Sequence, residues 1–368
     1  MYRRTWCEVN LDEIEENVRK IKGICGKKLI AVLKADAYGC GDIQTAQAVL
    51  DAGADMIAVS SLDEAMMLRN EGCDAEILIL GATDPDDCAT MIENNITAAA
   101  YSMDWIEKVS RNFCRGLKVH LKVDTGMNRI GFKDKDELKK ALEALLNAEC
   151  DVEGIFTHFC CTDTDPSMTD RQFARFKEAV EYLNYPFAWI HCDNSDATIM
   201  FKDDLSNACR LGVSMYGVSP YDKTLAHPLS LYTETAMVKH VPAGETIGYG
   251  ATYTTKGDEI IATIPIGYAD GFIRANQGRK VYVDGELCEV VGRVCMDQTM
   301  IRLDHEVPVG TKVEIFGQHI SIESMAEELH TIPYEIMCLI SGRVTRVYVR
   351  NGEQQSEMNE RLQKSESE

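Results

Sequence analysis

The residue types that could do chemistry in this sequence stand at the ends of short apolar runs. Lys34 follows the apolar run at positions 29–33, where a lysine side chain would be partly desolvated. Desolvation lowers the pKa of an amine, and a neutral amine is a nucleophile for Schiff-base chemistry. A lysine at the end of a strand can equally extend its ammonium group into water. Lys34 is therefore a candidate nucleophile, and its position alone leaves both roles open.

Histidine, arginine and glycine occupy comparable places further along the chain. His158 ends another apolar run, and by itself it also fits a hydrogen-bonded core histidine. Arg210 lies inside the apolar run 208–213, where a guanidinium group needs a partner or a ligand, and Gly212 would let a backbone N–H approach an anion closely. Three more polar residues follow the run that ends at Ile190, namely His191, Asn194 and Ser195. Such a set at one site would suit an aldehyde cofactor that carries a phosphate, pyridoxal phosphate.

The elements that must bring these residues together are predicted by an alternation of apolar runs and amphipathic stretches. Eight candidate strands lie at 28–35, 56–60, 76–80, 97–101, 117–123, 152–158, 187–191 and 208–213. Helical patterns between them include 11–25, 43–52, 62–70, 138–148 and 170–183, and Ser61 and Ser102 precede acidic helix starts as N-caps do. About eight βα units in roughly 220 residues indicate a TIM-like (β/α)8 barrel, whose active site lies at the carboxyl ends of the strands. An open doubly wound sheet is the alternative, but no GxGxxG motif opens the first helix.

Strands predominate after about residue 229. Candidates lie at 232–240, 259–266, 280–283, 288–291, 299–303, 312–316 and 343–349, and turn sequences such as Asp284-Gly285 separate them. The sequence therefore predicts an α/β protein with three parts. These are a (β/α)8 barrel over residues 1–228, a mostly β domain over 229–352 and a polar, frayed tail over 353–368.

The composition of the 368 residues is that of a soluble globular protein, with 45% hydrophobic and 26% charged residues. The formal net charge of −21 makes nucleic acid and anionic membranes poor partners. The first residues hold no apolar signal core and no apolar run reaches membrane length, which predicts a cytoplasmic protein whose 14 cysteines are reduced thiols. The nearest metal-like cluster is His158, Cys160, Cys161 and Asp163, but paired CxxC spacing is absent, and we expect no metal.

A resemblance to the bacterial alanine racemases emerges once these segments are taken together. In the predicted barrel the matching motifs are AVLKADAYG (31–39), KVDTGMNRIG (122–131), THF (157–159), NS (194–195), RLGV (210–213) and YG (216–217). In the predicted β domain they are GYGA (248–251), IGYADG (266–271), GRVCMD (292–297) and YE (334–335). They follow the family's order over nearly the whole chain. The resemblance implies a pyridoxal-phosphate-dependent isomerase of fold type III, a homodimer that interconverts L-alanine and D-alanine and supplies D-alanine for peptidoglycan.

The resemblance also implies roles residue by residue. Lys34 would form the Schiff base with pyridoxal phosphate, and Tyr249 would reach the site from the partner subunit as the second catalytic base. The residues that would hold the cofactor are Tyr38, His158, Asn194, Ser195, Arg210, Gly212, Val213 and Tyr334. The residues that would bind the substrate are Arg129 and Met296. The supporting residues would be Lys122, His191, Tyr268 and Asp297.

Two of these roles can be argued from the chemistry of racemisation. A proton leaves one face of the α-carbon and another returns to the opposite face, so two groups are needed, here Lys34 and Tyr249. Arg210 would face the pyridine nitrogen, and its guanidinium cannot accept a proton there because its own pKa is above about 12. The ring would then be a weaker electron sink than one paired with a carboxylate. We expect this to limit side reactions such as transamination.

Several alternatives stay open at this point. An ornithine- or lysine-type decarboxylase would need an acidic residue where Arg210 stands, and a non-catalytic cofactor carrier would not need a β domain with Tyr249. A racemase of serine, or of a broad range of amino acids, is the closest competitor, and Tyr334 favours alanine because serine-type relatives can differ at that position. Cys40 and Asp163 depart from the family's pattern and bear on substrate range. Lys122 is either carbamylated, as in some family members, or an ordinary lysine paired with a carboxylate.

Overall fold

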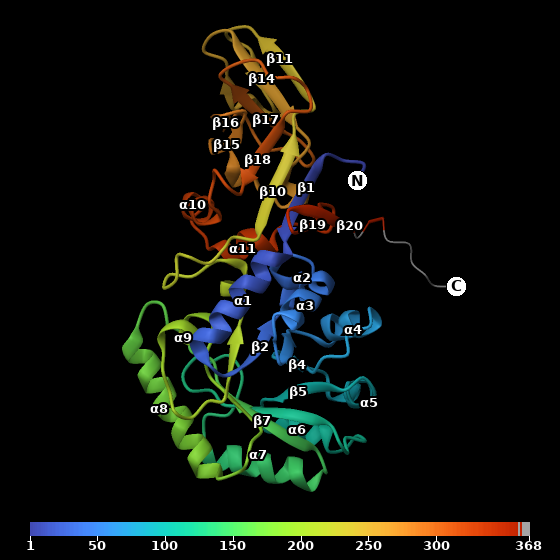
Figure 1. The fold of residues 1–368 in the computed structure, drawn as a ribbon, viewed down its shortest axis with the longest axis vertical. Coiled ribbons are helices and arrows are strands. Elements are labelled where there is room, and N and C mark those ends of the chain that lie inside the picture. The colour runs from blue at the N-terminus through green and yellow to red at the C-terminus, as the bar shows by residue number, and fades with distance from the viewer. Residues whose placement is uncertain (360, 363–368) are drawn as a thin grey trace, which may run out of the picture. The chain divides into compact units, whose positions relative to one another are not determined.

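The computed structural model describes residues 1–359 and 361–362, and the described chain forms two compact units (Figure 1). The barrel unit comprises Ile14–Ala37 and Asp42–Ala226. The β unit comprises Met1–Glu13, Tyr38–Gly41 and the chain from His227 onward. Neighbours in sequence such as Ala37 and Tyr38 therefore belong to different units.

In the described residues eight parallel strands close a barrel, and each strand pairs with the next one in sequence. They are β2 (Lys28–Val32), β3 (Met56–Val59), β4 (Ile77–Ile79), β5 (Ile96–Ala100), β6 (Lys118–Lys122), β7 (Asp151–Phe156), β8 (Trp189–His191) and β9 (Ala208–Leu211). β9 closes the barrel against β2, with Lys28 opposite Ala208 and Ile30 opposite Arg210. Most residues of these strands are buried, because helices cover a parallel barrel on the outside. The predicted barrel is confirmed, and the open doubly wound sheet is excluded.

Helices follow the strands as the periodicity predicts. They are α1 (Leu11–Cys25), α3 (Asp42–Asp51), α4 (Leu62–Asn70), α5 (Cys88–Glu93), α6 (Met103–Val109), α7 (Lys135–Asn147), α8 (Pro166–Leu183) and α9 (Ser195–Met200). Both predicted N-caps are confirmed, since Ser61 Oγ accepts a hydrogen bond from Glu64 N at 3.3 Å and Ser102 Oγ accepts one from Trp105 N at 3.2 Å. The helices α5 and α9 were not among the predicted patterns, because six residues are too few to display a 3.6-residue period.

A ten-stranded sheet dominates the described part of the β unit, in the order β11-β14-β17-β16-β15-β18-β10-β1-β19-β20. The strands in chain order are β1 (Thr5–Asn10), β10 (Leu229–Glu234), β11 (Met237–Val241), β14 (Glu259–Ile264), β15 (Lys280–Val283), β16 (Glu286–Val290), β17 (Thr299–Leu303), β18 (Lys312–Phe316), β19 (Thr345–Arg350) and β20 (Glu353–Met358). A two-stranded ribbon pairs β12 (Thr246–Ile247) with β13 (Tyr253–Thr254). Two helices, α10 (Ile322–Glu328) and α11 (Pro333–Cys338), lie between β18 and β19 in sequence. The predicted mostly β domain is confirmed.

Both ends of the chain differ from the prediction. Residues 1–13 were assigned to the barrel, but β1 lies in the sheet of the β unit, antiparallel to β10 and parallel to β19. The side chains of β1 alternate between buried and half-buried, the pattern of a strand with one covered face. Part of the predicted frayed tail, Glu353–Met358, is the strand β20 at the edge of this sheet, and residues 360 and 363–368 lie outside the described residues. An edge strand exposed on both faces needs no apolar pattern, so composition could not reveal it.

One predicted strand is two strands. The run 232–240 divides into β10 and β11, because the chain changes its hydrogen-bonding neighbours at Thr235 and Ala236. Thr235 N donates to Thr311 O at 2.9 Å, and Ala236 N donates to Thr263 O at 2.8 Å. The run 232–240 resembles one continuous strand in its β propensity, so nothing in the sequence indicated that the chain changes its partner strand there.

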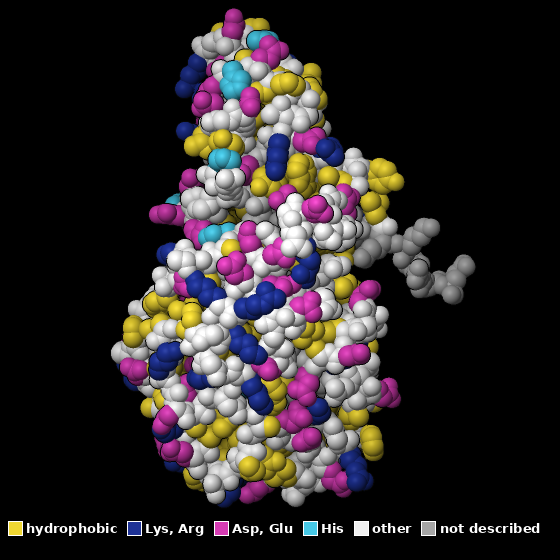
Figure 2. All heavy atoms as spheres, in the orientation of Figure 1, with side chains coloured by type: hydrophobic (Ala, Val, Ile, Leu, Met, Phe, Trp, Pro, Cys, Tyr) yellow, Lys and Arg dark blue, Asp and Glu magenta, His cyan; other side chains and the backbone are white. Residues whose placement is uncertain are grey.

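The surface carries charges of both signs. On the face shown in Figure 2 acidic and basic side chains are interspersed. None of the helices in the described residues has the length and apolar character needed to cross a bilayer.

Candidate active site

Lys34 stands where β2 gives way to an unusual turn. The four residues after it, Ala35 to Tyr38, have positive φ angles between 49° and 56° and form a left-handed turn, labelled α2 (Lys34–Tyr38). Left-handed backbone costs non-glycine residues roughly 1–2 kcal/mol each and persists only where surrounding contacts hold it. Glu64 supplies one such contact, because its carboxylate accepts from Ala35 N and Ser60 N, both at 2.7 Å. The turn fixes the backbone from which the Lys34 side chain projects.

Arg210, on β9, is the centre of a buried polar network at the same barrel. Its guanidinium donates to three backbone carbonyls, at 3.0, 2.7 and 3.2 Å, and contacts two imidazole nitrogens. The imidazole contacts are Nη1 to His191 Nδ1 at 2.8 Å and Nη2 to His158 Nδ1 at 3.1 Å. All five partners are neutral acceptors, and Arg210 forms no ion pair within the described ranges. Burial lowers the pKa of Arg210 to about 10, which still leaves it charged at neutral pH.

The hydrogen bonds around Arg210 determine the tautomers of three histidines. Because an arginine only donates, His191 and His158 must accept at Nδ1 and carry their proton on Nε2. His191 Nε2 lies 2.9 Å from His120 Nδ1, so His120 accepts in turn and its own proton is also on Nε2. Burial first, and then the charge of Arg210, lowers the pKa of all three, for His120 to about 3. The site therefore holds three neutral imidazoles beside one cation.

Lys122, on β6, is buried in the same network with an unusual charge environment. Its Nζ donates to the backbone carbonyl of Val123 at 2.8 Å instead of pairing with a carboxylate. Burial, followed by the charge of Arg210, lowers the pKa of Lys122 to about 7. All three groups lie close to the ring of Phe156, with Lys122 Nζ 5.4 Å from its centroid, Arg210 Cζ 5.6 Å from it and the His191 ring stacked on it at 4.9 Å. In the part of the chain that the structure describes, Lys122 forms no ion pair with a carboxylate, in contrast to the predicted alternative of an ordinary carboxylate pair.

Arg129 lies on the loop that follows β6. The loop is closed by a bridge between Val123 and Phe132, and Asp124 Oδ1 accepts from the backbone N–H groups of Gly126 and Asn128, both at 3.0 Å. Arg129 is exposed. Its positive charge adds to burial and to Arg210 in lowering the pKa values of His158 and Lys122, which puts it within electrostatic reach of both.

The loops after β8 and β9 gather hydrogen-bond donors suited to an anion. Ser195 Oγ accepts from Gly212 N at 2.9 Å and from Ser214 N at 3.5 Å. Ser214 Oγ is buried and has no partner among the described residues. Asn194 has a structural task here, since its Oδ1 caps α9 by accepting from Ala197 N at 2.9 Å. Val213, which begins the short 3-10 turn η2 (Val213–Tyr216), is buried behind these donors.

Two predicted cofactor residues, Tyr38 and Tyr334, lie together in the β unit. Their ring centroids are 6.2 Å apart, and burial raises the pKa of Tyr38 well above its usual value. The segment that carries Tyr38 is tied to this unit by Arg346, whose Nε donates to Gly39 O at 3.1 Å. Gly39 has φ of 83°, and a Cβ there would lie 2.4 Å from Met337 O, so a larger residue could not take its place.

The remaining predicted residues of the β unit are exposed. Tyr249, in the short turn η3 (Tyr249–Ala251), is 72% exposed, Met296 52% and Tyr268 42%. Backbone hydrogen bonds join the segments of Tyr268 and Met296, since Tyr268 N donates to Cys295 O and Ala269 N donates to Met296 O, both at 3.0 Å. Asp297 pairs with Arg343 at 2.6 Å. Exposed aromatic and apolar side chains of this kind are typical of surfaces that meet a partner.

Sequence reasoning missed His120, which completes the imidazole chain. His120 and Lys122 lie two residues apart on β6, and side chains at that spacing point to the same side of a strand. The two-residue spacing was the signal in the sequence that could have identified His120. That the ring fits there could not be predicted locally, because it depends on Gly154 on β7, which leaves room for it. A Cβ at Gly154 would lie 2.6 Å from the His120 ring.

The metal-like cluster proposed in the sequence is not assembled. Within the described residues, one group of possible ligands converges, and it consists of Cys192, Asp193 and Asp203. His158, Cys160, Cys161 and Asp163 do not form such a group there. Lys27 Nζ lies 2.9 Å from Asp193 Oδ2 and 2.5 Å from Asp203 Oδ2, so the ammonium group of Lys27 already pairs with the converging carboxylates.

The barrel unit therefore has the features of a (β/α)8 enzyme, with an amine, neutral imidazoles, a buried guanidinium and anion-binding donors at the strand ends. Residues 9–220 match the family described as alanine racemase, N-terminal domain, and residues 228–348 match alanine racemase, C-terminal domain. The chain belongs to the alanine racemase family, whose members are isomerases.

Individual relatives agree with this assignment. Alanine racemase 1 of Bacillus subtilis (strain 168) is 42% identical over 95% of this chain and 94% of its own. The alanine racemase of Streptococcus pyogenes serotype M2 is 43% identical over 94% of this chain and 99% of its own. The crystal structure of the Bacillus anthracis alanine racemase with bound L-Ala-P superposes with a TM-score of 0.94 and 40% identity, covering 98% of both chains.

Proposed function

We propose that this protein is an alanine racemase that uses pyridoxal phosphate and two bases to interconvert L-alanine and D-alanine. The family assignment supports the reaction. The observation that carries the mechanism is Arg210, a buried cation all of whose hydrogen-bond partners are neutral acceptors.

The residues of the barrel unit fit pyridoxal phosphate. A phosphate needs several donors at one place. Ser195 Oγ, which accepts from Gly212 N and Ser214 N, keeps its own proton to donate, and the unpartnered Ser214 Oγ offers a second. Lys34 would bind the aldehyde carbon, and its charge is already one of the causes that lower the pKa of His158. Tyr38, Tyr334, Asn194 and Val213 would complete the cofactor's surroundings. When bound, pyridoxal phosphate supplies a carbonyl that links to amines and a ring that acidifies the α-proton of a linked amino acid.

Arg210 would limit that acidification to what racemisation needs. Its guanidinium donates to His191 and His158 and keeps its own proton, so it cannot serve as an acid–base partner for a ring nitrogen. A carboxylate in the place of Arg210 could accept a proton and share it with a bound ring, which the guanidinium cannot do. The neutral tautomers of His191 and His158 support the same conclusion, because both accept from Arg210 at Nδ1 and neither has a proton to give at that atom.

Lys34 and Tyr249 would move the protons. Lys34 Nζ would take or return the α-proton on one face of the substrate, and Tyr249 Oη would do so on the other. Tyr249 is 72% exposed on the β unit, which supports its donation to the site of a second copy in a homodimer. Arg129 and the backbone at Met296 would hold the substrate carboxylate, with Tyr268, Asp297, Lys122 and His191 as supports.

A chiral assay tests the reaction. Purified protein with pyridoxal phosphate would be offered L-alanine, L-serine and L-lysine separately, and the D-isomer would be followed. We expect alanine to turn over fastest, and Tyr249→Phe to lose roughly 100- to 10,000-fold in kcat, the range for loss of a general acid–base group. Tyr2→Phe is the matched control, since Tyr2 is 91% exposed. Faster turnover of serine or lysine would show that alanine is not the preferred substrate but would leave the proposed mechanism standing. The absence of D-product from all three amino acids would refute the proposal.

Subunit mixing tests the shared site. Lys34→Ala and Tyr249→Phe homodimers would each be inactive, but a mixed dimer contains one site with Lys34 from one copy and Tyr249 from the other. Random exchange makes half of the dimers mixed, and one of two sites in each is intact, so about a quarter of the wild-type activity should return. A mixture that stays inactive after exchange, verified by mass spectrometry of the intact dimers, would show that each copy completes its own site.

We further propose that the protein works in the cytoplasm and that its product enters peptidoglycan. Deleting the gene should then make growth depend on added D-alanine. Growth without it would indicate a catabolic role or a second racemase.

A further inference from the structure

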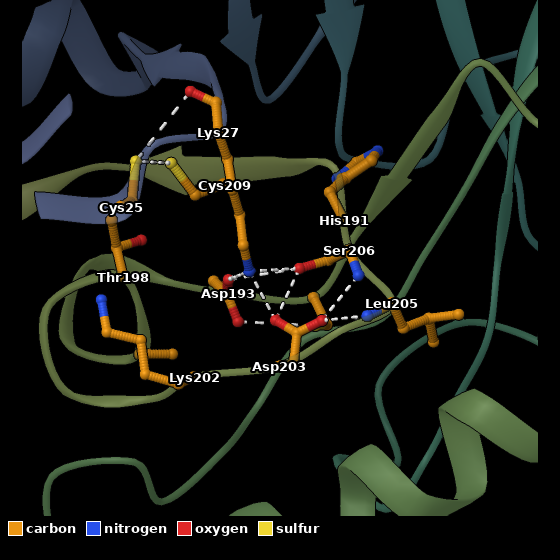
Figure 3. Close-up of polar contacts among 12 residues, drawn as sticks. Cys25, Lys27, His191, Asp193, Thr198, Lys202, Asp203, Leu205, Ser206 and Cys209 are labelled. Carbon is orange, nitrogen blue, oxygen red and sulfur yellow. Dashed lines mark hydrogen bonds and ion pairs between the residues drawn. The ribbon is translucent and has the colours of Figure 1, made fainter. Parts of the chain in front are cut away.

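Two cysteines of the barrel unit lie side by side, and neither is among the residues assigned to racemisation. Cys25 is the last residue of α1, and Cys209 is on β9, 184 positions later in the sequence. Their Sγ atoms are 3.5 Å apart, and Figure 3 shows the two side chains pointing toward each other. The strand pairing explains this approach, since Leu29 of β2 lies opposite Cys209.

The two thiols have different surroundings. Cys25 is half-buried, whereas Cys209 is fully buried. The hydrogen bond with Cys209, aided by the backbone and the positive charge of Lys27, lowers the pKa of Cys25 to about 6. The same contact and burial raise the pKa of Cys209. A partly accessible thiolate beside a buried thiol is the arrangement of an attacking and a resolving cysteine.

The neighbouring ion cluster holds this corner of the barrel in place. Figure 3 shows Lys27 reaching into the group formed by Asp193, Asp203 and Ser206. Lys27 Nζ lies 2.9 Å from Asp193 Oδ2 and 2.6 Å from Ser206 Oγ, and the Asp203 side chain is fully buried. Because Lys27 is two residues from Cys25, the cluster anchors the segment that carries the half-buried thiol. The two sulfur atoms are therefore held close together by a helix end and a barrel strand, and not by mobile surface loops.

We propose that Cys25 and Cys209 form a peroxide-reactive dithiol that closes into an intramolecular disulfide. The Cys25 thiolate attacks one oxygen of a hydroperoxide, the O–O bond breaks, and hydroxide or alkoxide leaves as Cys25 becomes a sulfenic acid. Cys209 then attacks the Cys25 sulfur, the S–O bond breaks, and water leaves with the thiol proton. Two thiols are oxidised to one disulfide and the peroxide is reduced, so the step is balanced.

The disulfide has a consequence for stability. It would close a loop of nearly half the chain, and such a cross-link restricts the unfolded ensemble. It would also link α1 to β9, the strand in which Arg210 directly follows Cys209. We therefore expect the oxidised protein to have a higher Tm than the reduced protein, with reversal by a thiol reductant.

Peptide mapping of the peroxide-treated holoenzyme tests the proposal. Trypsin would release Cys25 in the peptide GICGK (23–27) and Cys209 in DDLSNACR (203–210), so the disulfide yields one cross-linked pair of unmistakable mass. With limiting hydrogen peroxide we expect this pair to appear before oxidation of other cysteines. In Cys209→Ser, Cys25 should instead accumulate as a sulfenic acid that dimedone traps. In Cys25→Ser, Cys209 should stay reduced.

Cys73→Ser is the matched control, because Cys73 is half-buried as Cys25 is, and this variant should keep both the cross-link and the rise in Tm. The wild-type digest decides the question even if a variant fails to fold. Absence of the cross-linked pair while other cysteines oxidise would overturn the proposal. So would irreversible over-oxidation of Cys25 in the wild-type protein with Cys209 left as a thiol.

Discussion

Acidification should destabilise the barrel through its buried histidines, and His120 allows the size of the effect to be worked out. The pKa of His120 is lowered to about 3 by burial and then by the charge of Arg210, whereas an unfolded histidine has a pKa of about 6.5. The unfolded state therefore takes up a proton below about pH 6.5 that the folded state does not bind until about pH 3. Stability is fully present above the unfolded pKa and falls as the pH falls through that window.

The linkage relation gives the magnitude. For a group with an unfolded pKa of about 6.5 and a folded pKa of about 3, the free energy of unfolding is about 2 kcal/mol lower at pH 5 than at neutral pH. His158 and His191 act in the same direction, because burial lowers their pKa values well below the usual one. Lys122 contributes little here, since below about pH 7 it is protonated in both states.

Two measurements check this reasoning. Titration of the holoenzyme labelled at histidine carbons should show His120 in the Nε2–H tautomer down to about pH 5, and His158 and His191 in the same tautomer well below the usual pKa of a histidine. In denaturant titrations between neutral pH and pH 5, the free energy of unfolding of His120→Asn should fall by about 2 kcal/mol less than that of the wild type. His240→Asn, at an exposed site, is the control for general acid effects. A His120 resonance that titrates near pH 6, or equal losses in all three proteins, would contradict the proposed proton positions.

Two further predictions concern the same network. The lowered pKa of Lys122, about 7, leaves a neutral amine at pH 8 that can add CO2 and release a proton, and the resulting anion would face Arg129 and Arg210. Carbon-13 bicarbonate should therefore give a carbamate resonance that Lys122→Arg lacks, and the same resonance in both proteins would refute this. Gly154→Ala should destabilise the barrel by about 1–3 kcal/mol, because the new Cβ would lie 2.6 Å from the His120 ring. Unchanged unfolding midpoints would show that the ring can move aside.

Much of the fold follows from the sequence alone. Apolar runs of strand length alternate with amphipathic stretches, and a chain with eight such repeats buries them best by closing a barrel. The same reasoning places Lys34, His158, His191 and Arg210 near one another, because the carboxyl ends of parallel strands meet at one end of a barrel. The motifs for Tyr249 and Met296 were visible only through the resemblance, since nothing in their local pattern predicts chemistry.

Other features were decided by tertiary contacts. β1 and β20 join the sheet of the β unit through backbone hydrogen bonds, which do not depend on residue type and leave little trace in composition. The left-handed turn after Lys34 consists of residues that favour other conformations, and contacts such as the one from Glu64 hold it.

Local patterns along the chain are enough to predict the barrel, the family and the residue types of the site, because each depends on hydrophobic period and motif order. The tertiary structure decided the protonation states. Burial, the guanidinium of Arg210 on β9 and further positive charges such as that of Arg129 lower the pKa values of His120, His158, His191 and Lys122, and these groups come from separate parts of the chain. Electrostatic free energy depends on distances through space, and those distances exist only once the barrel has closed.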